Sequence, residues 1–204
     1  MTLDQETVDL LAEQLESAEH QNKPITKITD IYPNLDWGDA YAIQNALRWR
    51  KTASGVKIAG LKAGLTSKAK MKQMKVEEPV FGFLCDYGAY TDGSVIPIKN
   101  FIAPRVEAEI AFITEREIAG PVYGIDDILP ALKFVTPAIE ILDSRYQNFQ
   151  FDLISVVADN TSAAGFVVGD CLQAPAELDL VGLKVVVEKN GRVIEEGTGA
   201  AVLG

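Results

Sequence analysis

Apolar residues recur at intervals of three and four near the N-terminus, the spacing of a helix with one buried face. One such stripe predicts a helix over residues 5–19, followed by a polar, proline-containing linker. A second stripe predicts a helix from Trp37 or Gly38 to about Thr52, with Asp36 as a candidate N-cap. The stripes comprise Val8, Leu10, Leu11 and Leu15 in the first helix and Ala40, Tyr41, Ile43, Ala46 and Leu47 in the second.

The pattern changes after Gly55, where short β-branched runs alternate with clusters of Gly, Pro, Asn and Asp, the composition of strands and turns. A strand is expected over residues 56–61. Ser67 is expected to cap a short helix that ends near Met74, and residues 126–132 are expected to be helical despite a proline within them.

The strongest hairpin signal lies in residues 183–196, where Asn190-Gly191 separates two apolar runs. Asn-Gly favours the type I′ turn, whose twist matches that of paired strands. We therefore expect a mixed α+β fold, with an N-terminal helical region over residues 1–54 and a β-rich catalytic domain over residues 55–204.

Two glutamates interrupt an alternating apolar pattern in residues 104–112. Because side chains at positions i and i+2 of a strand share a face, Glu107 and Glu109 should project to the same side, roughly 6 to 7 Å apart. Glu140 interrupts a second apolar run, in residues 136–143. Carboxylates in apolar strands are costly unless a cation or hydrogen-bond donors compensate them, so a shared divalent metal ion is one explanation.

A set of three glutamates offers only hard oxygen ligands, which suit magnesium or manganese better than zinc or copper. Three protein ligands around an octahedral ion leave three positions, enough for a bidentate 2-oxo acid and one water. The competing interpretation of the Glu107–Glu109 pair is two solvated acids on an exposed strand face.

Lys62 lies between Gly60 and Gly64 in an otherwise apolar segment. Desolvation or a nearby charge would suit this lysine to acid/base work or to binding a substrate carboxylate. The alternative is an ordinary strand lysine whose ammonium group reaches solvent.

Two further polar residues are candidates for substrate binding. Arg145 would pair either with a substrate carboxylate or with an acid of the protein, such as Asp143. Ser162 is expected to form hydrogen bonds rather than act as a nucleophile, because the single histidine, His20, lies in a polar stretch and offers no general base.

Composition narrows the function further. The net charge of −10 and the pI near 4.6 argue against a nucleic-acid-binding surface, and the lysines around Lys62 to Lys75 are interpreted as a solvated helix face. No eighteen-residue apolar stretch or signal peptide is present, which favours a cytoplasmic protein without membrane spans. Cys85 and Cys171 are expected to be reduced structural thiols.

Several segments together resemble the hydratase/decarboxylase group of the fumarylacetoacetate hydrolase superfamily, in the order found there and over essentially the whole chain. They are Leu61–Ser67, Glu78–Phe83, Val106–Ile110, Pro137–Ile141, Asp143–Arg145 and Ala158–Ser162. The resemblance implies a twisted, barrel-like mixed β body with N-terminal and peripheral helices, and a homo-oligomer. Members of the group usually continue for several dozen residues beyond the equivalent of Gly204, so part of the β body is expected to be missing.

The resemblance also implies roles for individual residues. Glu107, Glu109 and Glu140 would be the ligands of Mg²⁺ or Mn²⁺, and Lys62 the catalytic acid/base or substrate-positioning group. Ser162 and Arg145 would contact the substrate, as would Lys62. These roles are expectations carried by the matching motifs, not by the spacing of the residues alone.

The activity implied is metal-dependent decarboxylation of the 2-oxo-enedioate 2-oxo-3-hexenedioate to 2-hydroxypenta-2,4-dienoate and CO2, in the meta-cleavage degradation of aromatic compounds. The alternative is hydration of 2-hydroxypenta-2,4-dienoate. Hydratases of the group commonly carry an acid where this chain has Val80, and the segment around Lys62 is more similar to the decarboxylases. A further alternative is a noncatalytic, truncated partner of the pathway hydratase, with which decarboxylases of the group associate.

Overall fold

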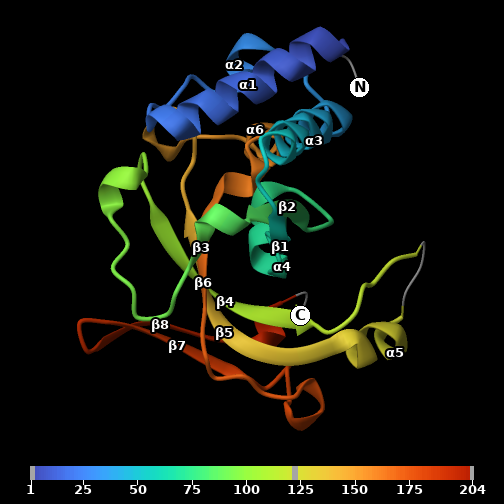
Figure 1. The fold of residues 1–204 in the computed structure, drawn as a ribbon, viewed down its shortest axis with the longest axis vertical. Coiled ribbons are helices and arrows are strands. Elements are labelled where there is room, and N and C mark those ends of the chain that lie inside the picture. Colours follow the sequence, from blue (N-terminus) through green and yellow to red (C-terminus); the bar gives the residue numbers. More distant parts are fainter. Residues whose placement is uncertain (1–2, 121–123, 203–204) are drawn as a thin grey trace.

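A computed structural model describes residues 3–120 and 124–202. A layer of helices covers one end of a β-rich body (Figure 1). The helices are α1 Gln5–Gln21, α2 Ile28–Ile31, α3 Trp37–Ala53, α4 Lys68–Met74, α5 Ile125–Ile128 and α6 Leu153–Ala158. The strands are β1 Ile58–Gly64, β2 Val80–Cys85, β3 Ala89–Tyr90, β4 Arg105–Thr114, β5 Leu132–Leu142, β6 Ala163–Val168, β7 Lys184–Lys189 and β8 Arg192–Thr198. Short 3-10 helices connect several of them.

The two long N-terminal helices begin at side-chain caps. Asp4 accepts a hydrogen bond from the Thr7 backbone N–H at 2.8 Å and starts α1, which ends at Asn22 in the left-handed conformation. Asp36 and Asp39 accept from each other's backbone N–H groups and start α3. Both helices, and Asp36 as the cap of the second, are therefore confirmed.

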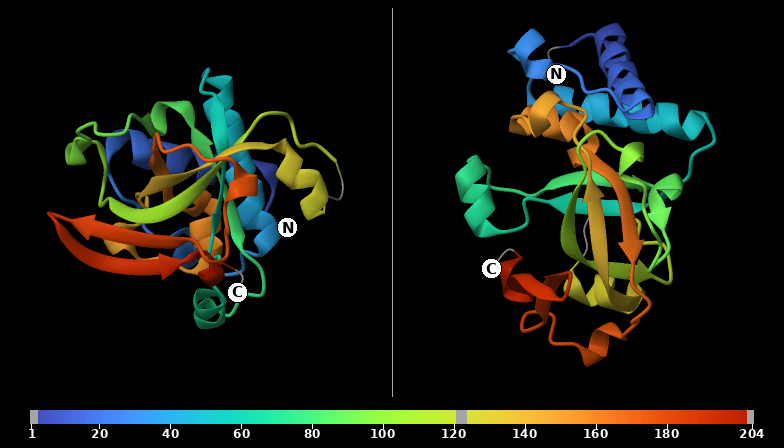
Figure 2. Two further views of the ribbon diagram at one scale, coloured as in Figure 1. Left: turned by 90° about the horizontal axis from the view of Figure 1, so that it is seen from below. Right: turned by 90° about the vertical axis from the view of Figure 1, so that its left-hand side faces the viewer.

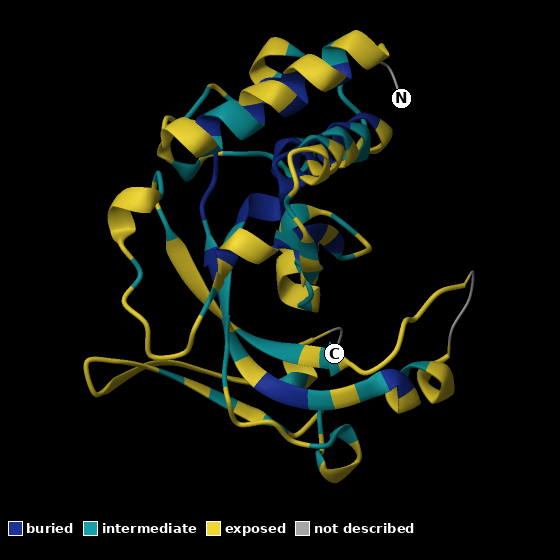
Figure 3. Cartoon of the chain, in the orientation of Figure 1, coloured by how far each residue is buried: buried dark blue, intermediate teal, exposed yellow. Residues whose placement is uncertain are grey.

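The helical layer shares one core with the β-rich body. Helix α1 packs on α3, and α3 packs on α6, while the core continues to strand β2. Figure 3 shows the buried residues concentrated where these elements meet. Core side chains with 2% exposure or less include Val8, Leu11, Leu15, Ile43, Leu47, Phe83, Tyr146 and Val157. The expected division between residues 54 and 55 stays a prediction, but burial of this apolar surface ties the two regions together.

The strands form three sheets. Strands β1 and β2 are an antiparallel pair, β7 and β8 are another, and the largest sheet has the order β3-β6-β5-β4. In that sheet β5 is antiparallel to both neighbours, whereas β3 runs parallel to β6. Within the described residues these sheets do not close into a barrel, which corrects the barrel-like part of the expected fold. Among the described strands, β4 pairs only with β5 and the two-residue β3 pairs only with β6, so these two strands are the edges of the largest sheet.

Local turn chemistry accounts for most of the smaller elements. The β7–β8 hairpin is confirmed, with Asn190 and Gly191 at φ values of 54° and 72°, as a type I′ turn requires. Ser67 caps α4 as expected. The helix expected over residues 126–132 is instead α5, then a 3-10 turn that contains Pro130, then β5 from Leu132. Proline cannot donate the next helical hydrogen bond, so the α-helix stops before it.

Across residues 3–120 and 124–202, no helix combines the length and the apolar character that crossing a membrane would require.

Gly82 in β2 lets a buried turn lie directly against the strand. A Cβ atom at this position would lie 2.5 Å from Thr161 Oγ1 and 2.9 Å from Asn160 Oδ1. We expect Gly82→Ala to lower the free energy of unfolding by about 1–3 kcal/mol, because the turn has to move to make room. Gly197→Ala is the matched control, since a Cβ atom there meets nothing within 4 Å. Equal urea-unfolding midpoints for the two variants would contradict this expectation.

Candidate metal centre

The register of the β4–β5 pair brings the three glutamates together. Glu107 lies directly opposite Glu140, and Glu109 lies opposite Ala138, two positions along the same face. One carboxylate oxygen from each glutamate lies within 4.8 Å of the others. The structure therefore forms a cluster of three carboxylates from two neighbouring strands.

The glutamates repel one another in a partly desolvated site. Glu140 is 5% exposed, Glu109 is half-buried and Glu107 is exposed. Burial, followed by the charges of Glu140 and Glu107, raises the pKa of Glu109 to about 7. Burial likewise raises the pKa of Glu140, although Lys62 opposes this. Three hard carboxylate donors at this separation fit a divalent ion such as Mg²⁺ or Mn²⁺.

Lys62 on β1 reaches this cluster. Its Nζ atom lies 2.5 Å from Glu140 Oε1 and donates to the Thr161 carbonyl oxygen at 3.2 Å. The Lys62 side chain is 9% exposed, so its ammonium group is largely desolvated. Lys70 of α4 approaches Glu107 at 3.7 Å, but this side chain is 62% exposed. Helix α4 projects from the body at the end of the β1–β2 strand pair (Figure 2). Of the two lysines near the cluster, Lys62 is therefore the buried one.

Ser162 belongs to a tight turn, Asn160–Ser162, that lies against β2 next to Lys62. The turn is held by the Asn160 side chain, which accepts from the Phe83 backbone N–H at 2.8 Å and donates to the Phe83 carbonyl at 2.9 Å. All three residues of the turn have positive φ values, between 49° and 58°. Ser162 was a candidate from the sequence, whereas the Asn160 side chain that holds the turn was not, although asparagine tolerates the left-handed conformation better than most residues.

Arg145 is placed elsewhere. Its guanidinium group donates to the Asp159 carboxylate and carbonyl, to the Asp143 carbonyl at 2.8 Å and to the Ala163 carbonyl at 2.9 Å. The residue is 1% exposed. Burial alone would lower the pKa of Arg145, but Asp159 and then Glu19 more than reverse this and keep it raised. Arg145 thus pairs with a buried acid of the protein, Asp159, which is one of the two partners expected from the sequence. It does not contact the glutamate cluster.

Asp143 holds the segment before β4 in place, a role that its position in the sequence does not reveal. Its two carboxylate oxygens accept hydrogen bonds from the Ile102 and Ala103 backbone N–H groups, both at 2.7 Å. These residues immediately precede β4. The end of β5 is thereby tied to the start of β4, which helps to set the register that places Glu107 opposite Glu140.

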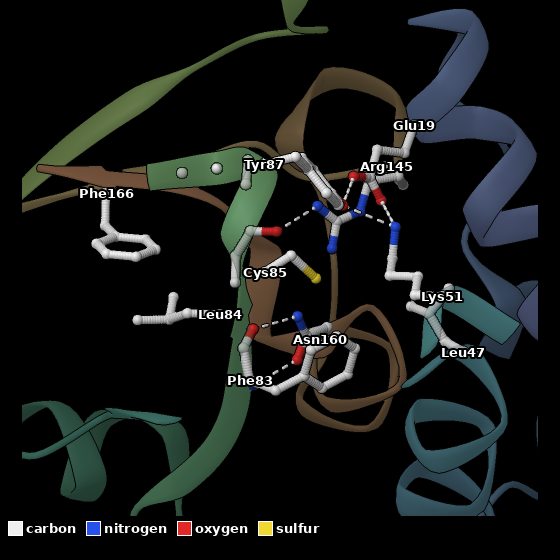
Figure 4. A pocket seen from close by; sticks show the side chains of 14 residues that line it. Glu19, Leu47, Lys51, Phe83, Leu84, Cys85, Tyr87, Arg145, Asn160 and Phe166 are labelled. Atoms are coloured by element: carbon white, nitrogen blue, oxygen red, sulfur yellow. Dashed lines mark hydrogen bonds and ion pairs between the residues drawn. The ribbon is translucent and has the colours of Figure 1, made fainter. Parts of the chain in front are cut away.

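A second charged group joins the helices to the body around a small cavity (Figure 4). Lys51 of α3 donates to Glu19 of α1 at 2.8 Å and to the Tyr87 hydroxyl at 2.8 Å, and that hydroxyl donates to Glu19. Cys85 lines the same cavity as a free thiol whose pKa is raised by burial. The charges are paired with one another, so this cavity is a structural junction.

The raised pKa of Glu109 predicts that metal binding releases protons near neutral pH. Its pKa lies near 7 without metal, and a bound dication favours the ionised form. At pH 6 we expect Mg²⁺ binding to release close to one proton per site, and at pH 8.5 almost none. Calorimetry in buffers with different ionisation enthalpies measures this release. In the metal-free protein the protonated Glu109 stabilises the folded state, and this contribution of Glu109 is lost as the pH rises from about 4.5 to 7, because the folded state binds the extra proton. Proton release that is equal at both pH values would contradict the assignment.

The fold and site define a class of protein, an α+β scaffold that presents a three-carboxylate centre for a hard divalent ion beside a buried lysine. The chain belongs to the family of 4-oxalocrotonate decarboxylases and related dienoate hydratases. It is 51% identical to the 4-oxalocrotonate decarboxylase of Pseudomonas sp. (strain CF600), a match that covers 100% of this chain and 77% of the relative. It is 37% identical to a 2-hydroxypent-2,4-dienoate hydratase of Pseudomonas putida, covering 99% of this chain and 91% of that protein.

A solved structure agrees with this assignment. The 4-oxalocrotonate decarboxylase of Pseudomonas putida G7, complexed with magnesium and adipate, superposes with a TM-score of 0.95 at 49% identity. That match covers 100% of this chain and 77% of the solved one. No family model matches the chain.

Proposed function

We propose that this protein decarboxylates 2-oxo-3-hexenedioate (4-oxalocrotonate) to 2-hydroxypenta-2,4-dienoate and CO2, with Mg²⁺ or Mn²⁺ as cofactor. The observation that carries the proposal is the cluster of Glu107, Glu109 and Glu140, whose oxygens lie within 4.8 Å of one another and against Lys62. Similarity to decarboxylases at 51% identity supports the same activity.

The three glutamates would hold the ion, which when bound supplies a positive charge that makes a chelating 2-oxo acid a better electron sink. The reaction itself breaks the C5–C6 bond of the substrate. The electron pair moves through C4 and C3 onto the C2 oxygen, C6 leaves as CO2, and one proton is then added to the C2 oxygen.

Lys62 is the residue that we assign to this proton. Because its ammonium group contacts Glu140 at 2.5 Å, it lies beside the end of the site where the 2-oxo acid would bind. From there it would donate a proton to the C2 oxygen and be reprotonated from solvent.

The test is a direct assay of CO2 release from 2-oxo-3-hexenedioate with Mg²⁺ or Mn²⁺, with the ion removed by a chelator as the control. Addition of water to 2-hydroxypenta-2,4-dienoate is measured in parallel. Hydration without CO2 release would replace the proposal by the hydratase alternative. The buried, apolar Val80, 3% exposed, offers no acid at the position where hydratases of the group commonly carry one, which favours the decarboxylase. A folded chain that binds no divalent ion would favour the noncatalytic partner.

We also propose a scaffold of the fumarylacetoacetate hydrolase type, divided into residues 1–54 and 55–204, with Ser162 in contact with the substrate. The protein would be a cytoplasmic homo-oligomer that forms a complex with the pathway hydratase. Light scattering of the purified protein, alone and mixed with the hydratase, tests both assemblies.

A further inference from the structure

The Asn160–Ser162 turn stores unfavourable free energy next to the candidate metal centre. Three consecutive non-glycine residues lie in the left-handed region, which is unfavourable for L-residues, and such strain is concentrated at functional sites. The turn is kept in place from both sides. Asn160 is bonded to Phe83 of β2, and Asp159 at the start of the turn is bonded to Arg145.

The same turn contains two buried hydroxyl groups, on Thr161 and Ser162, that find no hydrogen-bond partner among residues 3–120 and 124–202. These residues are 5% and 2% exposed. A buried polar group left unpaired is destabilising because it loses its hydrogen bonds to water, so native proteins rarely leave one unpaired. Thr136 shows the usual arrangement, because its equally buried hydroxyl donates to the Gly169 carbonyl at 2.9 Å.

The Thr161 hydroxyl lies on the same face of the β1–β2 pair as the Lys62 side chain. Gly82 is paired with Lys62 across the two strands, and a Cβ atom at Gly82 would lie 2.5 Å from Thr161 Oγ1. Directly paired residues project to the same face of a sheet. Because Lys62 also touches the Thr161 carbonyl and Glu140, the hydroxyl adjoins the glutamate cluster through Lys62.

We infer that the Thr161 hydroxyl binds the second carboxylate of a dicarboxylic substrate and so makes the site selective for dicarboxylates, an inference that rests on the proposed decarboxylase function. A hydroxyl donor beside an ammonium group suits a carboxylate oxygen, and a charge-assisted bond is stronger than a neutral one. The metal ion held by the glutamate cluster would bind the 2-oxo acid end of the substrate. Thr161 would bind the carboxylate at the other end, which is lost as CO2.

Binding of two probes in the presence of Mg²⁺ tests this inference. Adipate carries a carboxylate at each end, whereas hexanoate has the same chain length and only one. We expect Thr161→Val to reduce the preference for adipate over hexanoate by about tenfold or more, which is the loss of one hydrogen bond to a charged group. Hexanoate affinity should stay unchanged, and Thr161→Ser should retain the preference. Thr161→Ala replaces the valine variant if that variant does not fold.

Thr136→Val is the matched control, because it removes a buried hydroxyl bonded within the protein and should lower stability without changing the preference. An unchanged preference in Thr161→Val, or an equal loss of affinity for both probes, would overturn the inference alone. If the unmodified protein shows neither Mg²⁺-dependent adipate binding nor CO2 release, the proposed function fails and the inference falls with it.

Discussion

Replacing Glu140 with glutamine is expected to lower the rate of CO2 release by at least about a hundredfold and to weaken Mn²⁺ binding by a similar factor. Glu140 is the most buried of the three glutamates, lies opposite Glu107 and contacts Lys62 at 2.5 Å. Glutamine keeps the shape of the side chain but removes the charge that a dication needs. Electron paramagnetic resonance titration of Mn²⁺ measures the affinity, and the CO2 assay measures the rate.

The control for this variant is Glu115→Gln. Glu115 directly follows β4 and is exposed, so its substitution removes one negative charge from the same part of the chain outside the cluster. We expect both its metal affinity and its rate to remain within about twofold of the unmodified protein, since exposed charges interact weakly through water. Normal Mn²⁺ binding by Glu140→Gln would remove the metal centre from the proposal, whatever happened to the rate.

The largest expected effect on stability comes from Arg145→Met, which should lower the free energy of unfolding by about 3–5 kcal/mol. The substitution leaves Asp159, 0% exposed, without its cation, and removes a hydrogen-bond donor from the Asp143 and Ala163 carbonyls. Urea unfolding followed by circular dichroism measures the change. Asp159→Asn in the Arg145→Met background should recover part of the loss, because it removes the uncompensated buried charge.

Arg50→Met is the comparison for this stability effect. Arg50 also pairs with a carboxylate, Glu16 at 2.7 Å, but its side chain is 32% exposed. An ion pair with this much contact with water is worth at most about 1 kcal/mol. If Arg145→Met and Arg50→Met lowered stability equally, the buried Arg145–Asp159 pair would not be the support of the turn that carries Thr161 and Ser162.

The elements that could be predicted from the sequence depend on neighbouring residues. Helix α3 begins where Asp36 can cap it, and the β7–β8 hairpin turns at Asn190-Gly191. Each signal acts within a few residues and does not depend on the rest of the fold. Prediction is less accurate where pairing with a residue distant in the sequence decides where an element begins and ends. Strand β1 covers residues 58–64 rather than 56–61, because pairing with β2, not local preference, sets its ends.

By itself the sequence determined that Glu107 and Glu109 share one face of a strand, because side chains alternate along every strand. Only the tertiary structure decided that Glu140 lies opposite Glu107, since the register between two strands depends on long-range pairing and on ties such as Asp143. It also placed Arg145 against Asp159, away from the glutamate cluster. A charged side chain can reach many partners, and the free energy of burying it selects among them only once the chain is folded.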